Sequence, residues 1–145
     1  MRYATQDDVL ALVELGRPFL NQHPMLKGVT VPDEGMAAAL SNIIEQGVII
    51  VAEDINGELI GFLAGMLAPV WCAPNCTVAA ELAWWMKPGH RHGMTAVRML
   101  RQFEAWAESK NADQVIVSSI PAISKKVGNL YGKLGYELVE NSYRK

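Results

Sequence analysis

The stretch Trp84–Ala96, which reads WWMKPGHRHGMTA, decides how the rest of the chain is interpreted. Residues 81–86 predict the end of a strand, residues 88–93 a tight turn, and residues 94–109 an amphipathic helix. A glycine-containing turn that enters a helix leaves several backbone N–H groups unpaired, and the helix dipole adds positive potential there. The stretch therefore predicts an anion site suited to phosphate groups.

The side chains of this turn favour the same site. Lys87, Arg91 and His92 supply positive charge, and Gly89 and Gly93 let the backbone come close to a ligand. The alternative is an ordinary strand-to-helix turn whose basic residues are solvated. These residues taken alone leave both interpretations open.

Outside this stretch, strands and helices alternate in a mixed order. Val9, Leu12 and Val13 predict an opening helix that stops at Gly16, and Asn56-Gly57 predicts a type I′ hairpin turn. The expected elements are a strand 1–4, a helix from Thr5 with a Thr5–Asp8 capping box, a loop 17–30, a helix 32–47, strands 48–54 and 58–68, a loop 69–77, a strand 78–87, a helix 92–111, a strand 114–120, a helix 121–134 and two strands within 136–145. This order predicts an α+β, or mixed α/β, fold and one domain over residues 1–145.

Composition excludes several classes of protein. The chain has 145 residues, 50% of them hydrophobic, and a formal net charge of −2. We therefore expect a globular protein that binds no nucleic acid. No apolar run reaches the roughly 18 residues of a membrane span, and the start has no signal-peptide pattern, so a soluble, cytoplasmic protein is expected.

The two cysteines do not complete a metal site. Cys72, Cys76, His90 and His92 form the pattern C-x3-C-x13-H-x-H. A zinc finger needs histidines spaced H-x3–5-H on one helical face, whereas two histidines at i and i+2 rarely converge on one ion. We expect no metal.

The segment from Met86 to Ala96 resembles the acetyl-CoA motif of the GNAT (GCN5-related N-acetyltransferase) family. Pro88 and Arg91 match that motif in spacing. His92 stands where glycine is common, Gly93 comes one position early, and the following residues replace the small residues around the last glycine. This compact Arg-His-Gly-x-Thr-Ala form is similar to phage-associated GNAT sequences.

A second segment carries the same resemblance. The pattern from Ser124 through Tyr131-Gly-Lys-Leu-Gly-Tyr136 is similar to the family's Asn-x6-Tyr-x-Lys-Leu-Gly-Phe segment, with Ser124 in place of asparagine. The opening MRYATQDDVLALVELG is similar to the family's first strand and helix, so the resemblance covers nearly the whole chain. It implies a GNAT-like acyl-CoA N-acyltransferase fold, with a mixed, mostly antiparallel sheet of about six to seven strands and about four helices.

The resemblance also implies a reaction: acetyl-CoA as cosubstrate gives its acetyl group to a primary amine that attacks the thioester directly. Tyr131 matches the family's general acid, and a backbone N–H at Met86 would stabilise the oxyanion. Glu81 is the candidate base, acting through water, or else a surface carboxylate. The residues expected to bind the cosubstrate are Trp84, Met86, Lys87, Arg91, His92, Gly93, Met94, Thr95, Ala96, Ser124 and Lys133.

Several alternatives stay open. The acceptor can be a small-molecule amine or a protein amine, with His23 and the loop 17–30 as candidates for its side of the site, and a homodimer is possible. Lys125 and Lys126 either reach a phosphate or form a solvated helix face. The domain can instead bind acyl-CoA without turnover, as a sensor or interaction module. A third interpretation is a small interaction domain with no ligand.

Overall fold

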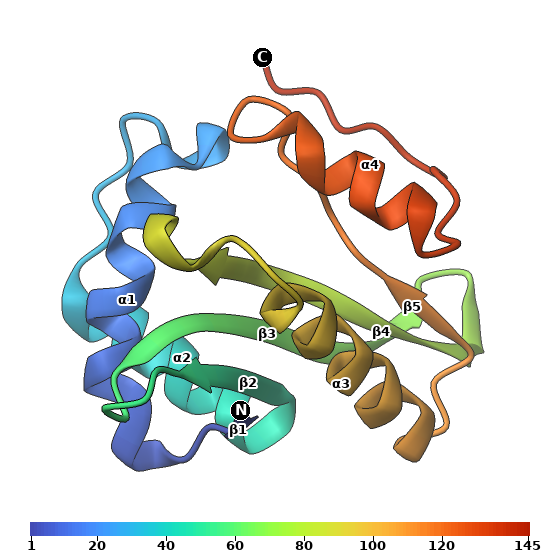
Figure 1. Cartoon of the computed structure of the whole chain (residues 1–145). Coiled ribbons are helices and arrows are strands. Elements are labelled where there is room, and N and C mark those ends of the chain that lie inside the picture. Colours follow the sequence, from blue (N-terminus) through green and yellow to red (C-terminus); the bar gives the residue numbers. More distant parts are fainter.

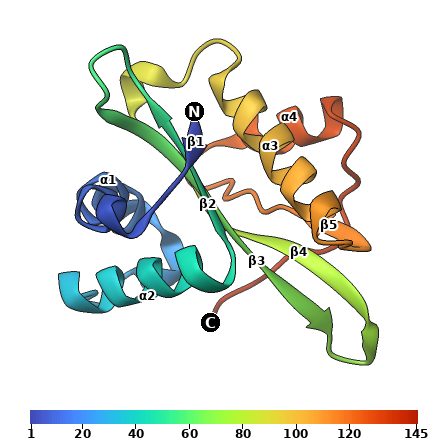
Figure 2. The ribbon, with the colours of Figure 1, turned by 90° about the horizontal axis from the view of Figure 1, so that it is seen from below.

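One five-stranded sheet runs through the computed structural model, which describes residues 1–145 (Figure 1). Helices α1 and α2 cover one face of the sheet, and α3 and α4 lie on the other (Figure 2). None of the helices combines the length and the apolar character that crossing a membrane requires. The elements in chain order are β1 (Arg2–Tyr3), η1 (Gln6–Asp8), α1 (Val9–Gln22), η2 (Pro24–Leu26), α2 (Asp33–Gln46), β2 (Val48–Glu53), β3 (Leu59–Val70), β4 (Ala73–Met86), η3 (Pro88–His90), α3 (Thr95–Ser109), β5 (Gln114–Ile116) and α4 (Lys125–Lys133).

The strands lie in the order β1-β2-β3-β4-β5, and only the β4–β5 pair is parallel. That pair is short, because Val78–Ala80 of β4 is the only part that has partners in β5. One residue further on, β4 carries a bulge: Gly65 of β3 lies opposite Glu81 and Ala64 opposite Ala83, so Leu82 has no partner. A bulge bends its strand and increases the local twist. The last third of β4 therefore leaves its parallel neighbour.

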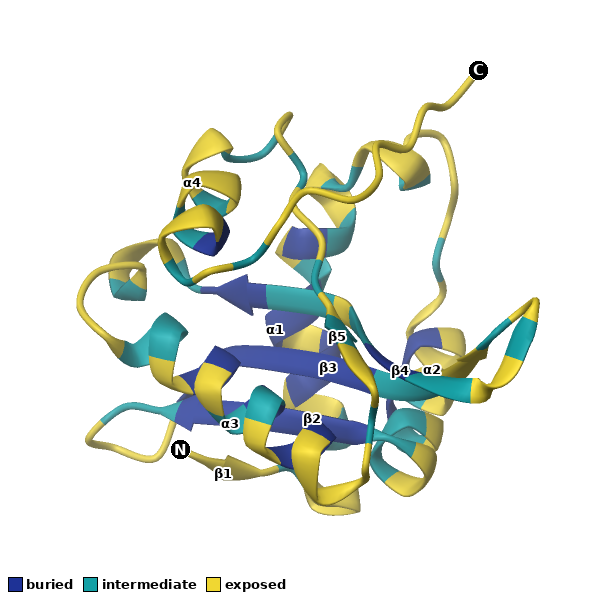
Figure 3. Cartoon of the chain, turned by 90° about the vertical axis from the view of Figure 1, so that its right-hand side faces the viewer, coloured by how far each residue is buried: buried dark blue, intermediate teal, exposed yellow.

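Two hydrophobic clusters pack against the two faces of the sheet, whose central strands are buried (Figure 3). Successive strand residues alternate between the faces, so Trp85 joins Phe62 and Phe19 beneath α1, whereas Trp84 packs on the α3 side. Phe103 of α3 is fully buried on that side.

Helix α1 is longer than predicted. It passes through Gly16 and Pro18 and ends only at Gln22, so the expected loop 17–30 begins six residues late. Tertiary packing overrides both stop signals, because Phe19 is buried against Trp85 and extends the apolar stripe of the helix. The remainder of the expected loop contains one turn of 3₁₀ helix.

The β3–β4 hairpin also extends further than predicted. Its strands continue to Val70 and start again at Ala73, so residues 69–77 are mostly strand rather than loop. Pro69 and Pro74 are tolerated because β2 and β5 both stop short of this end of the hairpin. A proline at an unpaired strand edge removes no ladder hydrogen bond.

The turn between β2 and β3 differs in type from the prediction. Type I′ needs a positive φ at both central residues, but Gly57, at φ +81°, is the only residue of this turn with one. The carboxylate of Asp54 organises the turn by accepting the backbone N–H groups of Asn56 and Glu58, each within 3.0 Å. The hydrogen bonds of the Asp54 side chain thus stabilise the turn without a second residue in the left-handed conformation.

The expected six to seven strands are five. Residues 136–145 form no strand, and β5 ends at Ile116 instead of residue 120. A final pair of strands would have to pair with a long edge strand, but β5 at the edge of the sheet is only three residues long. Two helices also start later than predicted, α3 at Thr95 because Gly93 has φ +75°, and α4 at Lys125 because Ser124 is its N-cap.

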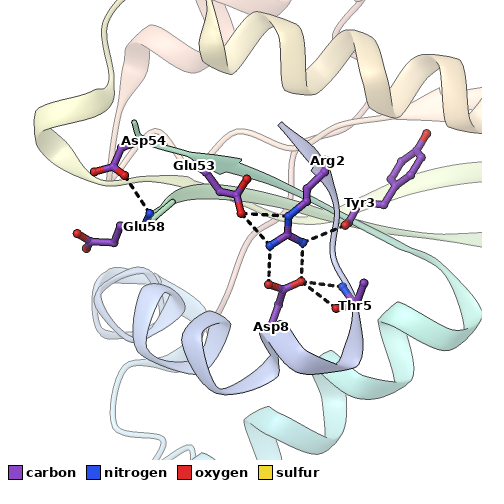
Figure 4. A network of polar contacts seen from close by, with 7 residues as sticks. All are labelled: Arg2, Tyr3, Thr5, Asp8, Glu53, Asp54 and Glu58. Carbon is purple, nitrogen blue, oxygen red and sulfur yellow. Dashed lines mark hydrogen bonds and ion pairs between the residues drawn. The ribbon is translucent and has the colours of Figure 1, made fainter. Parts of the chain in front are cut away.

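A charged network joins the short edge strand to the first helical turn (Figure 4). The guanidinium of Arg2 donates to both carboxylate oxygens of Asp8 at 2.8 Å and pairs with Glu53 of β2. Asp8 also accepts the backbone N–H of Thr5 at 2.7 Å, which is one half of the predicted capping box. These contacts lower the pKa of Asp8 to about 2, and the hydrogen bond from Arg2 is the largest cause.

We predict that Asp8→Asn destabilises the fold in a pH-dependent way. The pKa of Asp8 is lowered on folding from 3.8 to about 2, so its contribution is present at pH 7 and is lost as the pH falls through that range. Because Arg2 is partly exposed, we expect a loss of about 1–2 kcal/mol at pH 7. Urea unfolding at several pH values measures it.

Asp7→Asn is the matched control, since Asp7 is exposed in the same turn and forms no ion pair. The control should match the wild type throughout. A deficit for Asp8→Asn that stays constant from pH 7 down to pH 2 would contradict the electrostatic explanation.

Candidate active site

The parting of β4 from β5 leaves an unpaired backbone edge. We call the edge of residues 81–86 that faces away from β3 the free edge of β4. Lys87 donates its N–H to Ile60 of β3 at 2.9 Å, and in an antiparallel pair such residues alternate with residues that point outward. The N–H groups of Trp84 and Met86 consequently point outward from the free edge, where no strand accepts a hydrogen bond from them.

The turn after β4 leaves a second set of donors. No backbone N–H from Arg91 to Val97 donates to an acceptor within the chain, and the first helical bond of this region is Arg98 N–H to Met94. Gly93 makes the turn possible, because its φ of +75° lies in the left-handed region. These free donors lie at the positive end of the α3 dipole. The arrangement predicted for an anion site is therefore present.

Arg91 holds this turn against the strand instead of extending freely into solvent. Its Nε donates to the carbonyl of Met86 at 2.9 Å, and its guanidinium carbon lies 4.2 Å from the centre of the Trp85 ring. A cation over an aromatic face is attracted by the ring quadrupole. The terminal guanidinium nitrogens have no partner in the chain and remain available to an anion.

The other predicted cosubstrate residues are only partly brought together. His92, Met94, Thr95 and Ala96 lie in the same turn or in the first turn of α3, while Lys87 forms an ion pair with Glu58. Ser124 caps α4, accepting the N–H of Lys126 at 3.3 Å. Lys133 lies at the opposite end of α4, about 13 Å away along the axis.

Glu81 occupies the point where the two strands separate. Its carboxylate accepts the backbone N–H of Ser118, 2.9 Å away, in the segment that follows β5. Burial raises the pKa of Glu81 to about 7, although the hydrogen bond from Ser118 acts in the opposite direction. A carboxylate with a pKa near neutrality can both take up and release a proton under physiological conditions.

Tyr131 of α4 reaches the same segment from the other side. Its hydroxyl donates to the carbonyl of Ser118 at 3.0 Å, and its ring stacks on Trp84 with 5.9 Å between centroids. Burial, reinforced by the negative charge of Glu81, raises the pKa of Tyr131 well above 10. The phenol is therefore protonated at neutral pH and can act as a proton donor.

Ser118 is the residue that the sequence did not reveal. Its backbone connects Glu81 to Tyr131, because the N–H of Ser118 donates to Glu81 and its carbonyl accepts from Tyr131. The sequence predicted a strand up to residue 120, in which both groups of Ser118 would pair with a neighbouring strand. No local signal shows where a strand leaves its partner.

Tyr136 completes an aromatic layer on this face. Its ring centroid lies 5.5 Å from that of Tyr131, and its hydroxyl donates to Glu104 of α3 at 2.7 Å. Glu104 in turn accepts a hydrogen bond from Arg101. The C-terminal end of α4 is thereby fixed to α3, which limits how far Tyr131 can move.

The region expected for the acceptor lies beside α1. A surface pocket of about 350 Å³ is lined by Arg17, Asn21, Lys27 and neighbouring apolar residues. His23 packs edge-on against Phe19, and burial lowers its pKa. Burial therefore keeps His23 neutral at pH 7.

The four residues of the rejected metal pattern are far apart. Cys72 lies in the turn of the β3–β4 hairpin and Cys76 near the start of β4. His90 follows the other end of that strand, in η3. The ten strand residues from 77 to 86 place the cysteines about 30 Å from the histidines, so the two pairs cannot bind one ion together.

Solved structures resemble this fold over almost its full length. An aminoglycoside N-acetyltransferase, AAC(6')-Iy in complex with CoA, is 18% identical, with a TM-score of 0.79 and coverage of 99% of this chain and 92% of that one. An acetyltransferase with acetyl-CoA from Clostridium acetobutylicum is also 18% identical, with a TM-score of 0.76 and coverage of 99% and 93%. A ribosomal-protein-alanine N-acetyltransferase from Brucella melitensis biovar Abortus 2308 is 13% identical, with a TM-score of 0.73 and coverage of 99% and 96%.

Sequence comparison alone finds nothing comparable, since no protein-family model and no curated protein matches the chain. The structural likeness nevertheless extends over 99% of the chain in each case. Two of these neighbours are named for different acceptors, an aminoglycoside and a ribosomal-protein alanine. The chain has the fold of the GNAT acetyltransferases.

Proposed function

We propose that the protein transfers an acetyl group from acetyl-CoA to a primary amine by direct attack on the thioester. The observation that carries this proposal is the run of free N–H groups from Arg91 to Val97, adjoining the free edge of β4. A dense set of donors suits a pyrophosphate, and an unpaired strand edge suits an extended chain that carries amides. Acetyl-CoA contains both.

The cosubstrate would bind along these two features in succession. Its pyrophosphate would accept hydrogen bonds from the turn before α3 and from the terminal nitrogens of Arg91. Its pantetheine arm would follow the free edge of β4 toward Glu81, as an added strand does at a sheet edge. This path brings the thioester to the point where β4 and β5 part, beside the stacked rings of Trp84 and Tyr131.

The amine must lose a proton before it can attack. For a lysine-type amine with a pKa of about 10.4, deprotonation at pH 7 costs about 4–5 kcal/mol. Glu81, whose pKa is raised to about 7, would accept this proton through a water molecule. Its bond to Ser118 keeps the carboxylate at the point where the strands part.

The attack turns the carbonyl oxygen into an oxyanion. The outward N–H of Met86 would donate to it, in an edge where no strand competes. The loss of one such donor typically costs about 2.7–4 kcal/mol of transition-state stabilisation. The tetrahedral intermediate then collapses, with cleavage of the C–S bond.

Tyr131 would supply the proton that the departing thiolate takes up. Its hydroxyl is protonated at neutral pH and points to the carbonyl of Ser118, from which it must turn to the sulfur. A thiol of pKa about 8.5 leaves tolerably without help, so the acid accelerates the step without being indispensable. The products are the amide and free CoA.

The acceptor can be a small molecule or a protein. The neighbours include an aminoglycoside N-acetyltransferase and a ribosomal-protein-alanine N-acetyltransferase, so this fold serves both kinds of acceptor. The pocket beside α1 would receive part of the acceptor, because it lies near the end of the helix that packs on Trp85.

We predict that acetyl-CoA stabilises the protein thermally and that thiol is released when an amine and peptide library is added. Ligand at about 100 times its dissociation constant adds about 2.7 kcal/mol to the stability. Tyr131→Phe should reduce kcat about 10- to 100-fold with an unchanged Kd for acetyl-CoA, because only the acid is lost.

Tyr143→Phe is the control, since that tyrosine is 94% exposed in the C-terminal segment. Stabilisation by acetyl-CoA without thiol release from any acceptor would indicate a binding module instead of an enzyme. Full activity of Tyr131→Phe would remove its catalytic role. Absence of any stabilisation would favour a domain without this ligand.

A separate prediction concerns Glu81 and pH. Below pH 7, log(kcat/KM) for a lysine-type acceptor should rise with a slope of about 1, because Glu81 must be ionised to take the proton of the ammonium form, and above pH 7 it should level off. Glu81→Gln should lower kcat/KM about 100-fold at pH 8 and keep the slope near 1 throughout.

Stability gives an independent measure of the same residue. The pKa of Glu81 is raised on folding from 4.5 to about 7. The wild type should therefore lose stability as the pH rises from 4.5 to about 7. Glu81→Gln should not show this loss, whereas Glu14→Gln, a control on the exposed side of α1, should behave as the wild type. Identical profiles of stability against pH for the wild type and Glu81→Gln would show that the pKa of Glu81 is not raised. Identical profiles of kcat/KM against pH would remove Glu81 from the mechanism.

A further inference from the structure

The indole nitrogen of Trp84 is a donor without an acceptor. It is shielded from solvent, and it is the only buried side-chain nitrogen or oxygen in the chain that has no hydrogen-bond partner. Such groups are rare in folded proteins, because burying a donor without an acceptor is unfavourable. A tryptophan kept in this position requires an explanation beyond packing, since phenylalanine would fill an apolar site without that penalty.

The position of Trp84 suggests what the donor is for. The residue belongs to the free edge of β4, and its ring stacks on Tyr131 at an interplanar angle of 27°. The Trp84 ring is therefore where β4, which would hold the pantetheine arm, contacts α4, which carries the proposed acid. An acceptor entering here would be on the path of the cosubstrate.

We infer that the indole N–H of Trp84 donates a hydrogen bond to a carbonyl oxygen of the acyl-pantetheine arm of the bound cosubstrate. The inference rests on the proposed function, because it takes acetyl-CoA as the ligand. An amine acceptor is a poor partner for this donor, since its lone pair must be free to attack. The thioester carbonyl and the two pantetheine amide carbonyls are the acceptors that acetyl-CoA brings to this edge.

The contact has a consequence for the reaction. A donor that fixes the acyl-pantetheine arm against a ring stacked on Tyr131 sets the distance between the sulfur and the phenol hydroxyl. Positioning of this kind lowers the barrier by holding the reacting groups in one geometry. Trp84 would thus orient the acyl donor, whereas the backbone N–H of Met86 would act on the oxyanion.

The test compares the binding of acetyl-CoA and CoA to three full-length variants by calorimetry. Trp84→Phe removes the N–H and part of the ring. Replacement of Trp84 by 3-benzothienylalanine keeps the ring size and exchanges the N–H for sulfur. Trp71→Phe is the control, because Trp71 is 94% exposed at the tip of the β3–β4 hairpin.

Both Trp84 variants should bind acetyl-CoA about tenfold more weakly than the wild type and the control, while the unliganded stability of the benzothienylalanine variant, which keeps the ring, stays the same or rises. A loss confined to acetyl-CoA identifies the thioester carbonyl as the acceptor. An equal loss for CoA identifies a pantetheine amide.

Wild-type affinity in both Trp84 variants would overturn the inference and leave the proposed function intact. The same holds if only Trp84→Phe loses affinity, because ring contact would then explain the loss. If the wild-type protein binds neither acetyl-CoA nor CoA, the proposed function fails and this inference fails with it.

Discussion

The short parallel pairing of β4 with β5 is the constraint on which the rest of the site depends. The ladder ends at Ala80 and Ile116, and a bulge at Leu82 bends β4 directly afterwards. The N–H of Ser118 then bonds to the carboxylate of Glu81 instead of a strand carbonyl. The Glu81 side chain thereby provides the hydrogen bond that a neighbouring strand would otherwise give to the N–H of Ser118. The strands part without leaving the N–H of Ser118 unpaired, and the edge beyond stays open.

An aromatic layer keeps this separation in a fixed geometry. Tyr131 lies between Trp84 of the sheet and Tyr136 of the C-terminal segment, and the hydroxyl of Tyr136 reaches Glu104 on α3. Helix α4 is thus attached to β4 by ring stacking and to α3 by a charge-assisted hydrogen bond. The same burial that orders the layer raises the pKa values of both tyrosines, so structure and protonation state have one cause.

The parts of the site that the sequence predicted are those with local causes. The free N–H groups around Gly93 follow from a turn and a helix start, and Tyr131 follows from the spacing of a segment with a known resemblance. Ser118 could not be found in this way, because its role depends on where a strand leaves its neighbour. The extension of α1 through Pro18 likewise depends on the burial of Phe19 against a distant strand. The final strands failed for a related reason, since local β propensity cannot supply a missing sheet edge.

The connection through Ser118 also links the two proton transfers of the proposed reaction. The negative charge of Glu81 is one of the causes that raise the pKa of Tyr131. When Glu81 takes the proton of the attacking amine, that charge disappears and the phenol becomes a stronger acid. The base would therefore prime the acid, and in the required order, because the thiolate leaves only after the amine has attacked. A pKa of about 7 for Glu81 suits this sequence, since the carboxylate is available before the attack and can hold the proton after it.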